Sequence, residues 1–172
     1  MKGITLEGHK AIVTGGAQGL GAAITEHLAE EGCDVVVWDI NLEQARATAA
    51  DVAARTGRLV EGRAVDVTDA DAVRDAVDAA VALMGRLDVM VCNAGILIAG
   101  DSLTFDADKW RKVIDVDLTG YFLCAREAAR VMVPLGRGSI IQINSKSGKK
   151  GSFRNSAYAA AKFGGVGVTQ SL

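Results

Sequence analysis

The chain has 172 residues, of which 49% are hydrophobic and one is proline, so it suits a single folded domain better than a disordered or linker-rich chain. Its formal net charge of −2 gives no electrostatic case for binding nucleic acid or an anionic membrane. Cys33, Cys92 and Cys124 are isolated in apolar stretches and are interpreted as buried free thiols of a reducing compartment. No signal-peptide pattern and no membrane-length apolar run is found, so we expect a cytoplasmic protein.

Short β-branched runs alternate with longer amphipathic stretches, which predicts repeated βα units and a parallel sheet. The predicted strands are 10–14, 34–38, 59–65, 88–92 and 139–143, and the predicted helices are 19–31, 42–55, 69–84, 107–133 and 155–172. The strands are apolar on both faces, as in a sheet that helices cover on each side. We therefore expect an α/β fold, a three-layer, doubly wound parallel sheet of the Rossmann type, incomplete at the C-terminus.

A glycine-rich loop joins the first predicted strand to the first helix. Gly15, Gly19 and Gly21 have the spacing GxxxGxG, with Gln18 and Leu20 among them. Glycines let the backbone approach a pyrophosphate, and the N-terminus of the following helix favours phosphate through its N–H groups and dipole. The alternative is a tight turn without a ligand. The place of the loop after the first strand of a βαβ unit favours a dinucleotide site made by these five residues.

Asp39 follows the second predicted strand, 18 residues after Gly21. A carboxylate at this place accepts hydrogen bonds from the adenosine ribose hydroxyls and repels a 2′-phosphate. Gln18, Ile40 and Asn41 bring no basic side chain that would favour that phosphate. The sequence therefore favours NAD over NADP, with Asp39 and Ile40 among the residues that contact it. The alternative is that Asp39 only caps a helix or supports a loop.

Asp66 and Val67 end the third predicted strand. Because ligands of open α/β sheets bind at the carboxyl ends of the strands, a carboxylate and an apolar side chain at this point are placed to flank an adenine. Asp66 is equally suited to begin the next helix. Both interpretations stay open at the level of the sequence.

Tyr158, Lys162 and Ser145 combine the groups that a metal-free alcohol or carbonyl reaction needs. A free phenol titrates at about pH 10, so it needs a neighbouring cation to act as an acid/base near neutral pH. Tyr158 and Lys162 are one helical turn apart. Ser145 follows the fifth predicted strand, where its hydroxyl can hold a substrate oxygen. A lone Tyr-x-x-x-Lys is usually a pair of exposed side chains on a helix, but the serine and the separate glycine loop favour a catalytic site. His9 and His27 have no metal-ligand spacing and are not placed to serve Ser145 in a hydrolase, so no metal is expected.

These motifs resemble those of the short-chain dehydrogenase/reductase family, and the resemblance covers the whole chain. The family's motifs fall on residues 14–21, on Asp39, on Asn93-Ala94-Gly95, and on Ser145, Tyr158 and Lys162. The resemblance implies hydride transfer between NAD and an alcohol or carbonyl, with Tyr158 as acid/base and Ser145 holding the substrate oxygen. It also implies that Asn93-Ala94-Gly95 stabilises the sheet beside the cofactor. Lys162 would bind the nicotinamide ribose and lower the pKa of Tyr158.

One position departs from the family's pattern. Where the family usually has an asparagine that belongs to a proton relay, in a Val-Asn-Leu context, this chain has Asp117. An ionised aspartate accepts hydrogen bonds but cannot donate them. We expect activity to survive, with Asp117 holding the relay water and an altered pH profile. The alternative is that Asp117 only stabilises a kink in the long helix.

Within the family, residues 120–127, 141–151, 156–158 and 161–165 resemble bacterial polyol-phosphate dehydrogenases. This resemblance implies a polyol or polyol phosphate that is oxidised at a secondary alcohol to a ketose. Four basic side chains beside Ser145 are suited to attract a phosphate ester: Lys146, Lys149, Lys150 and Arg154. A solvated basic loop or a subunit contact explains them equally well. A 3-oxoacyl-thioester reductase is the alternative enzyme, although its usual NADP preference disagrees with Asp39.

A catalytically inactive NAD-binding fragment is the alternative from a different functional class. The family's last strands and substrate-binding loop should follow Leu172, so we expect residues 1–172 to form one NAD-binding domain that lacks them and does not turn over alone. The family also implies a homodimer or homotetramer formed through the long helices. Apolar residues such as Val113, Val116 and Phe122 are equally consistent with an intramolecular core.

Overall fold

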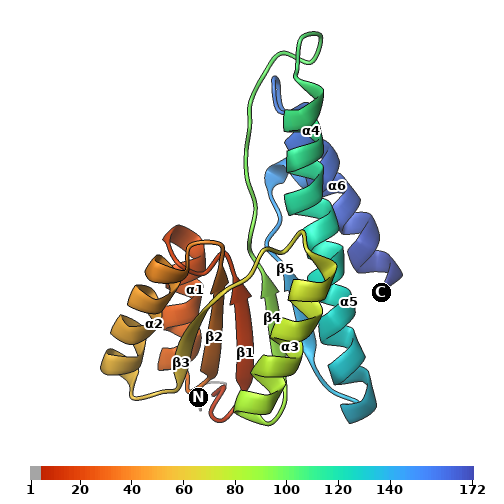
Figure 1. Ribbon diagram of the computed structural model, residues 1–172. Coiled ribbons are helices and arrows are strands. Elements are labelled where there is room, and N and C mark those ends of the chain that lie inside the picture. Colours follow the sequence, from red (N-terminus) through yellow and green to blue (C-terminus); the bar gives the residue numbers. More distant parts are fainter. Residues whose placement is uncertain (1–4) are drawn as a thin grey trace.

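In the computed structural model, which describes residues 5–172, five parallel strands form one sheet in the order β3-β2-β1-β4-β5. The strands are β1 (Lys10–Thr14), β2 (Asp34–Asp39), β3 (Val60–Ala64), β4 (Val89–Cys92) and β5 (Ser139–Gln142). The chain runs from β1 outward to β3, then crosses over to β4 and continues to β5 (Figure 1). All five predicted strands are confirmed. The change of direction between β1 and β4 creates the point where ligands of such sheets bind.

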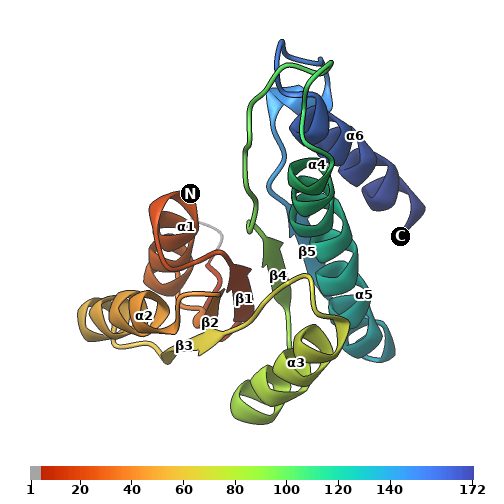
Figure 2. The same ribbon diagram turned by 45° about the horizontal axis from the view of Figure 1, so that its top comes forward.

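Helices cover both faces of the sheet, which confirms the predicted three-layer α/β fold (Figures 1 and 2). On one face lie α1 (Gly19–Glu30) and α2 (Leu42–Thr56), and on the other lie α3 (Ala70–Met84) and α5 (Gly120–Met132). The helix α4 (Ala107–Ile114) leads into α5, and α6 (Ser156–Ser171) packs against α4 and α5. Short 3-10 turns at Val133–Leu135 and Lys146–Gly148 flank β5.

Alternating side chains of the strands build two separate cores. Ile12, Val36 and Met90 are fully buried against α3 and α5, whereas Val13 and Val35 are fully buried against α1 and α2. Successive side chains of a strand point to opposite faces of the sheet. Because each face is covered by helices, both sets must be apolar. This is the physical reason for the continuous apolar runs in the sequence.

The apolar residues of the long helix divide into buried and exposed groups. Val113 is fully buried and Val116 packs against the core under α3 and α5, so these two belong to the intramolecular core. Phe122 on α5 is 41% exposed, and Phe163 on α6 is 46% exposed. The homo-oligomer that the resemblance implies stays a prediction.

The helix predicted over 107–133 contains a π-helical turn that the sequence did not reveal. This turn spans Asp115–Thr119, and the Gly120 N–H that ends it donates to the carbonyl of Asp115, five residues back. The wider turn joins α4 to α5 and leaves Asp117 almost fully buried, at 1% exposed. A π turn inserts one residue into the helix, and the residues on both sides of it still predict a helix, so the prediction of one helix over 107–133 gave no sign of the turn.

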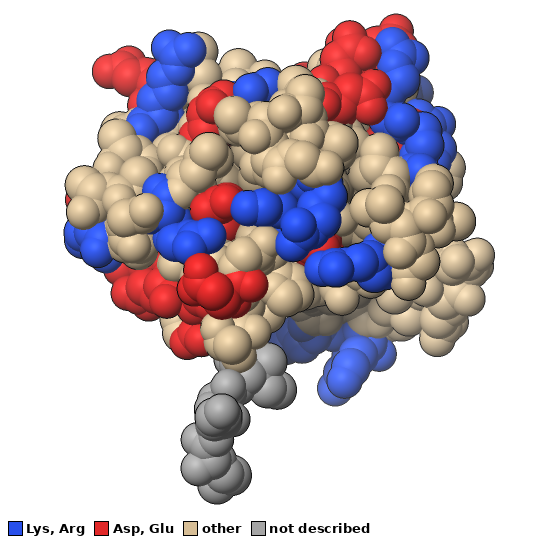
Figure 3. Space-filling view, turned by 90° about the horizontal axis from the view of Figure 1, so that it is seen from below, with Lys and Arg blue, Asp and Glu red and all other residues tan. Residues whose placement is uncertain are grey.

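Buried ion pairs occupy the amino ends of the strands. Asp88, whose side chain is 3% exposed, accepts hydrogen bonds from the Lys10 N–H, Arg86 and Arg137, and Asp34 pairs with the Lys10 ammonium. Figure 3 views this end from below and shows basic and acidic side chains beside one another. Although burial by itself raises them, the hydrogen bonds of Lys10 and Arg86 hold the pKa values of Asp34 and Asp88 below the ordinary aspartate value.

Cys33, Cys92 and Cys124 are buried and free, as predicted. Burial raises the pKa of the Cys33 thiol to about 11, so this side chain stays protonated at neutral pH. Within residues 5–172, no group of three or more His, Cys, Asp or Glu side chains is arranged to hold a metal ion. No helix of the same residues has the length and apolar character needed to cross a membrane.

Candidate functional site

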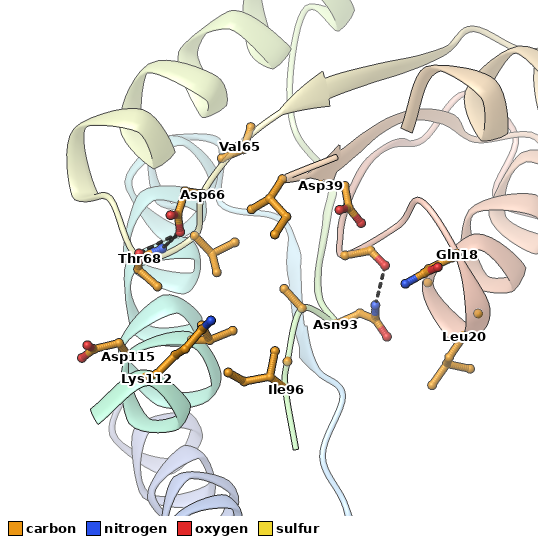
Figure 4. Close-up of a pocket in the computed structure, with 18 of the residues that line it drawn as sticks. Gln18, Leu20, Asp39, Val65, Asp66, Thr68, Asn93, Ile96, Lys112 and Asp115 are labelled. Carbon is orange, nitrogen blue, oxygen red and sulfur yellow. Dashed lines mark hydrogen bonds between the residues drawn. The ribbon is translucent and has the colours of Figure 1, made fainter. Parts of the chain in front are cut away.

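A cavity of about 840 Å³ opens at the carboxyl ends of β1–β4 (Figure 4). The loops that follow these four strands and the outer face of α4 form its walls. All predicted cofactor residues except Tyr158 and Lys162 line it, namely Gly15, Gln18, Gly19, Leu20, Gly21, Asp39, Ile40, Asp66, Val67, Asn93, Ala94 and Gly95. The fold thus brings together four sequence segments that were selected separately.

The glycine loop is clamped to the segment that follows β4. The Asn93 amide donates to the carbonyls of Thr14 and Gly15, each at 3.0 Å, and one of these bonds is drawn in Figure 4. A Cβ at Gly21 would collide with the Gly15 carbonyl oxygen and lie 2.6 Å from Asn93 Nδ2. Position 21 therefore requires glycine, because α1 begins in direct contact with this clamp.

The first turn of α1 is arranged to bind an anion. Gln18 precedes the helix in an extended conformation without a side-chain cap, and no acidic residue lies in the first turn. Gly19 has a φ of 55°, and a Cβ there would meet no atom within 4 Å. Because Gln18 provides no side-chain cap and lines the cavity with Gly19, the N–H groups of this turn are available to an anion in the cavity. This wall fits the diphosphate of a dinucleotide.

Asp39 is fixed by backbone N–H groups on the cavity wall. Its Oδ2 accepts from the Ala17 N–H at 3.3 Å and its Oδ1 from the Asn41 N–H at 3.1 Å. Asn41 is the residue that caps α2, since its Oδ1 accepts from the Gln44 N–H at 3.1 Å. The alternative that Asp39 caps this helix is therefore wrong, whereas the alternative that it supports a loop agrees with its two bonds to loop N–H groups. Beside it, Ile40 is 79% exposed and offers apolar surface at the cavity rim.

Asp66 forms a turn at the cavity and does not begin α3. Its Oδ1 accepts from the Thr68 N–H at 2.9 Å and from the Thr68 hydroxyl at 2.7 Å. Asp69 is the cap of α3. Of the two interpretations of Asp66, the structure contradicts the start of a helix and leaves the position at the cavity beside Val67.

Lys162 lies buried between Asp117 and Tyr158. Its Nζ is 3.4 Å from Asp117 Oδ2, donates to the Ile143 carbonyl at 3.2 Å, and lies 5.4 Å from the centroid of the Tyr158 ring. Lys162 is 5% exposed and Asp117 is 1% exposed. The helix α6 places the tyrosine and the lysine one turn apart, and the π turn brings the aspartate to them. Three of the four predicted catalytic residues therefore meet.

Asp117 also contacts two residues that line the cavity. Asp117 Oδ1 accepts from the Ile96 N–H at 2.7 Å, and a Cβ at Gly95 would lie only 3.0 Å from Asp117 Oδ2. Gly95 and Ile96 both line the cavity. Burial raises the pKa of the Asp117 carboxyl, against the opposing effects of the Ile96 N–H and the Lys162 ammonium.

Ser145, the fourth predicted catalytic residue, is tied to α6 through its neighbour. Its Oγ accepts from the Ser147 N–H at 3.1 Å and so caps the short turn that follows. Its own N–H donates to Asn144 Oδ1 at 2.7 Å, and Asn144 Nδ2 donates to the Lys162 carbonyl at 3.1 Å. Asn144 thus connects the loop after β5 to α6. The sequence analysis did not assign it a role.

Eight further residues, for which the sequence predicted no role in the site, line the cavity. Four of them, on α4 and the start of the π turn, are spaced by three, four and seven residues from the first: Asp108, Arg111, Lys112 and Asp115. The others are Val65, Thr68, Ile96 and Val116. The helical spacing of the first four is a polar stripe visible in the sequence. It could have been found, but only the fold shows that this stripe faces the glycine loop.

Comparison with known proteins agrees with this arrangement. The family described as "short chain dehydrogenase" matches residues 9–172. The chain belongs to the short-chain dehydrogenase family. The match includes the glycine loop, the cavity segments and the helix of Tyr158 and Lys162.

The similar proteins within the short-chain dehydrogenases are named for several different substrates. The chain is 45% identical over 164 residues to sorbitol-6-phosphate 2-dehydrogenase of Escherichia coli K12, covering 94% of this chain and 63% of that protein. It is 40% identical over 166 residues to 2-dehydro-3-deoxy-L-rhamnonate dehydrogenase (NAD(+)) of Sphingomonas sp. SKA58, covering 96% and 65%. The crystal structure of sorbitol-6-phosphate 2-dehydrogenase from Erwinia amylovora matches with a TM-score of 0.90 at 45% identity, covering 94% and 64%. The chain thus spans less than two thirds of the length of these relatives.

Proposed function

We propose that this protein is an NAD-dependent oxidoreductase that interconverts a secondary alcohol and a ketone by hydride transfer. The observation that carries the proposal is the contact between the Asp117–Lys162–Tyr158 group and the cavity wall at Ile96. An anion-binding helix end and a phenol with a neighbouring cation are the two parts that such a reaction needs. The start of α1 and Ile96 line the same cavity, which supports the proposal that one ligand reaches both parts.

The cavity residues divide the binding of a dinucleotide among them. The start of α1 would hold the diphosphate, Asp39 the adenosine ribose, and Asp66 with Val67 the adenine. The nicotinamide supplies the hydride acceptor or donor when bound. Asp39 favours NAD, because its carboxylate is fixed in the wall and would repel a 2′-phosphate. The basic side chain labelled in Figure 4, Lys112, comes from α4 on the opposite side of the cavity from Asp39.

The proton transfer rests on Tyr158. In alcohol oxidation its side-chain oxygen takes the hydroxyl proton of the substrate, and in ketone reduction it returns a proton. The Lys162 ammonium, near the Tyr158 ring, favours the negative charge on the phenolic oxygen. Ser145 would hold the substrate oxygen with its hydroxyl. Tyr158→Phe is expected to lower the rate by a factor of about 10²–10⁴, because it removes the proton donor.

The proposed substrate is a polyol or polyol phosphate. The 45% identity to sorbitol-6-phosphate 2-dehydrogenase supports it, as do the exposed side chains of Lys146, Lys149, Lys150 and Arg154. Arg154 has a φ of 61°, and its carbonyl accepts from the Gly100 N–H at 2.8 Å. This contact joins the loop that carries the four cations to the segment between β4 and α4.

The choice of cofactor is tested by calorimetric titration of the chain with NADH and NADPH. We expect NADH to bind at least about tenfold more tightly, and Asp39→Asn to remove most of that difference because it removes the charge that repels the 2′-phosphate. Asp75→Asn is the matched control, since Asp75 is exposed on α3 outside the cavity. Tighter binding of NADPH by the unmodified chain would contradict the proposal.

The substrate is tested with the full-length protein. Initial rates are compared for sorbitol 6-phosphate and sorbitol with NAD or NADP, and for an acetoacetyl thioester with NADH or NADPH. We expect the highest rate with NAD and sorbitol 6-phosphate, and a rise in KM for the phosphate ester in Lys149→Ala and Lys150→Ala. A rate only with NADPH and the thioester would reverse both assignments. Residues 1–172 are assayed in parallel, where NADH binding without turnover is the expected result.

Assembly as a homodimer or homotetramer is the further part of the proposal, and a small-molecule substrate is the expected partner. Phe122 and Phe163 leave partly exposed rings on α5 and α6, two helices that pack against each other. Burying such rings against a second copy would remove apolar surface from water. Light scattering after gel filtration tests this, and a monomeric mass for the full-length protein would contradict it. The cytoplasmic location stays a prediction from composition.

A further inference from the structure

A carboxylate with one unbonded oxygen is buried at the centre of the catalytic group. Asp117 Oδ1 accepts from the Ile96 N–H at 2.7 Å, whereas Oδ2 forms no hydrogen bond within the part of the chain that the structure describes. The charged atom that pairs with Oδ2 is Lys162 Nζ, 3.4 Å away. A buried charge of this kind is tolerated only beside an opposite charge.

Lys162 is the opposite charge, and it also serves Tyr158. Its ammonium is 5% exposed and is held by the Ile143 carbonyl at 3.2 Å. The same atom lies 5.4 Å from the centroid of the Tyr158 ring. One buried ammonium therefore interacts with two groups that carry negative charge when ionised. The part of the Lys162 charge that Asp117 neutralises no longer stabilises the phenolate form of Tyr158.

The groups that contact the pair are uncharged unless Tyr158 ionises, and one exposed cation, Lys146, lies on the 3-10 turn that packs against α6. The segment after β4 contributes the Ile96 N–H and Gly95, and the loop after β5 contributes the Ile143 carbonyl. From α6 comes Tyr158. Among residues 5–172, Asp117 and Lys162 form ion pairs only with each other. Asp117 is therefore the carboxylate that pairs with the ammonium beside the phenol.

We propose that Asp117 is a positioning residue that holds the Lys162 ammonium and offsets its charge, so that Tyr158 ionises and the reaction proceeds at a more alkaline pH than with a neutral side chain at position 117. This inference rests on the proposed function, because it gives Tyr158 the acid/base role. The fold supports it twice. The π turn buries Asp117, and Gly95 leaves the room that its Oδ2 occupies.

The ionisation of Tyr158 can be measured without substrate or cofactor. The chain has two tyrosines, and the second, Tyr121, is buried with its hydroxyl bonded to Thr169 Oγ1 at 2.8 Å. In a Tyr121→Phe background the near-ultraviolet phenolate absorbance therefore reports on Tyr158 alone. We expect Asp117→Asn to move the midpoint of this transition down by about half a unit to one unit, because it removes a negative charge near the phenol. Asp117→Glu should keep the midpoint near that of the parent.

Asp115→Asn is the matched control for the absorbance measurement. Asp115 lies in the same π turn and loses the same charge, but it is exposed and forms no ion pair with Lys162 in the described chain. We expect its midpoint to stay within about 0.2 units of the parent because solvent screens an exposed charge. An equal shift in both variants, or no shift in Asp117→Asn, would overturn the inference. Circular dichroism of each variant establishes that it is folded before the titration is interpreted.

The pH–rate profile of the full-length protein gives the second readout. If Tyr158 is the acid/base, Asp117→Asn moves the acidic limb of the profile for alcohol oxidation to lower pH by the same amount as the absorbance midpoint. If the absorbance midpoint shifted and the pH–rate profile did not, the inferred effect of Asp117 on Tyr158 would stand and the acid/base role of Tyr158 would be contradicted. An unshifted absorbance with an active enzyme would contradict the role of Asp117 alone. The two failures are therefore distinguishable.

Discussion

The two ends of the parallel sheet treat buried carboxylates in opposite ways. At the amino ends, Asp88 receives hydrogen bonds from two arginines and a backbone N–H, and these hold its pKa low. At the carboxyl ends, Asp117 has one backbone N–H and one ammonium at 3.4 Å, and burial raises its pKa. The same residue type is fully paired at one end and under-paired at the other.

The difference separates stabilising charges from charges that are available for chemistry. A carboxylate with several donors stabilises the folded state and changes little when a ligand arrives. An under-paired carboxylate beside a lysine costs free energy, and such sites are usual where a protein binds or reacts. In this chain the under-paired end is also the end with the cavity and the uncapped start of α1.

The largest effect on stability is expected at the amino end. Asp88→Ala leaves Arg86, Arg137 and the Lys10 N–H without their acceptor, so we expect a loss of about 3 kcal/mol in the free energy of unfolding. Urea denaturation measures it. Asp88→Asn is the control, since it keeps an acceptor for the backbone bond and should lose less. If both variants lost the same amount, the charge of Asp88 would have no part in stability and the comparison would break.

The next largest effect is expected at the glycine clamp of the carboxyl end. Gly21→Ala forces a methyl group against the Gly15 carbonyl and Asn93, so we expect a loss of about 2 kcal/mol and weaker NADH binding. Gly19→Ala is the matched control, because a Cβ there meets open space and the left-handed φ alone costs about 1 kcal/mol. Thermal unfolding with and without NADH compares them. A Gly19→Ala variant that is the less stable of the two would show that contact with the clamp does not govern this loop.

A smaller effect with an opposite dependence on pH is expected at Asp117. Burial raises its pKa in the folded state, so its contribution to stability is present below the ordinary value of 3.8 and is lost as the pH rises through the raised value. Asp34 and Asp88 have lowered pKa values and lose stability as the pH falls. Asp117→Asn should therefore gain stability relative to the parent as the pH rises from acid towards neutral. Urea denaturation at several pH values gives the difference, and a constant difference would contradict it.

The smallest effect is expected for a single partner of a shared carboxylate. Arg137 is half exposed, and Arg86 still binds Asp88 when Arg137 is removed. Arg137→Ala should therefore reduce the free energy of unfolding by only about 0.5 kcal/mol, and less at high salt. A loss as large as that of Asp88→Ala would show that the amino end depends on one ion pair instead of a network.

Most of the fold was predictable because its signals are local. The central strands β1, β2 and β4 are buried on both faces, whereas the edge strands β3 and β5 are partly exposed, and the predicted ends of all five were right to within one residue. The cavity segments were predictable because parallel strands end at one edge of the sheet, so that Gly15, Asp39, Asp66 and Asn93 had to lie near one another. The π turn and the part played by Asn144 were not, since neither leaves a periodic pattern.

The sequence by itself determined the order of βα units, the glycine loop, Asp39, and the Tyr158–Lys162 pair, because each depends on residues close together along the chain. Only the tertiary structure decided that Asp117, 45 residues before Lys162, is the partner of its ammonium. It also decided that the polar stripe of α4 faces the glycine loop. Both facts depend on how helices cross the end of the sheet, and packing between distant segments sets that crossing.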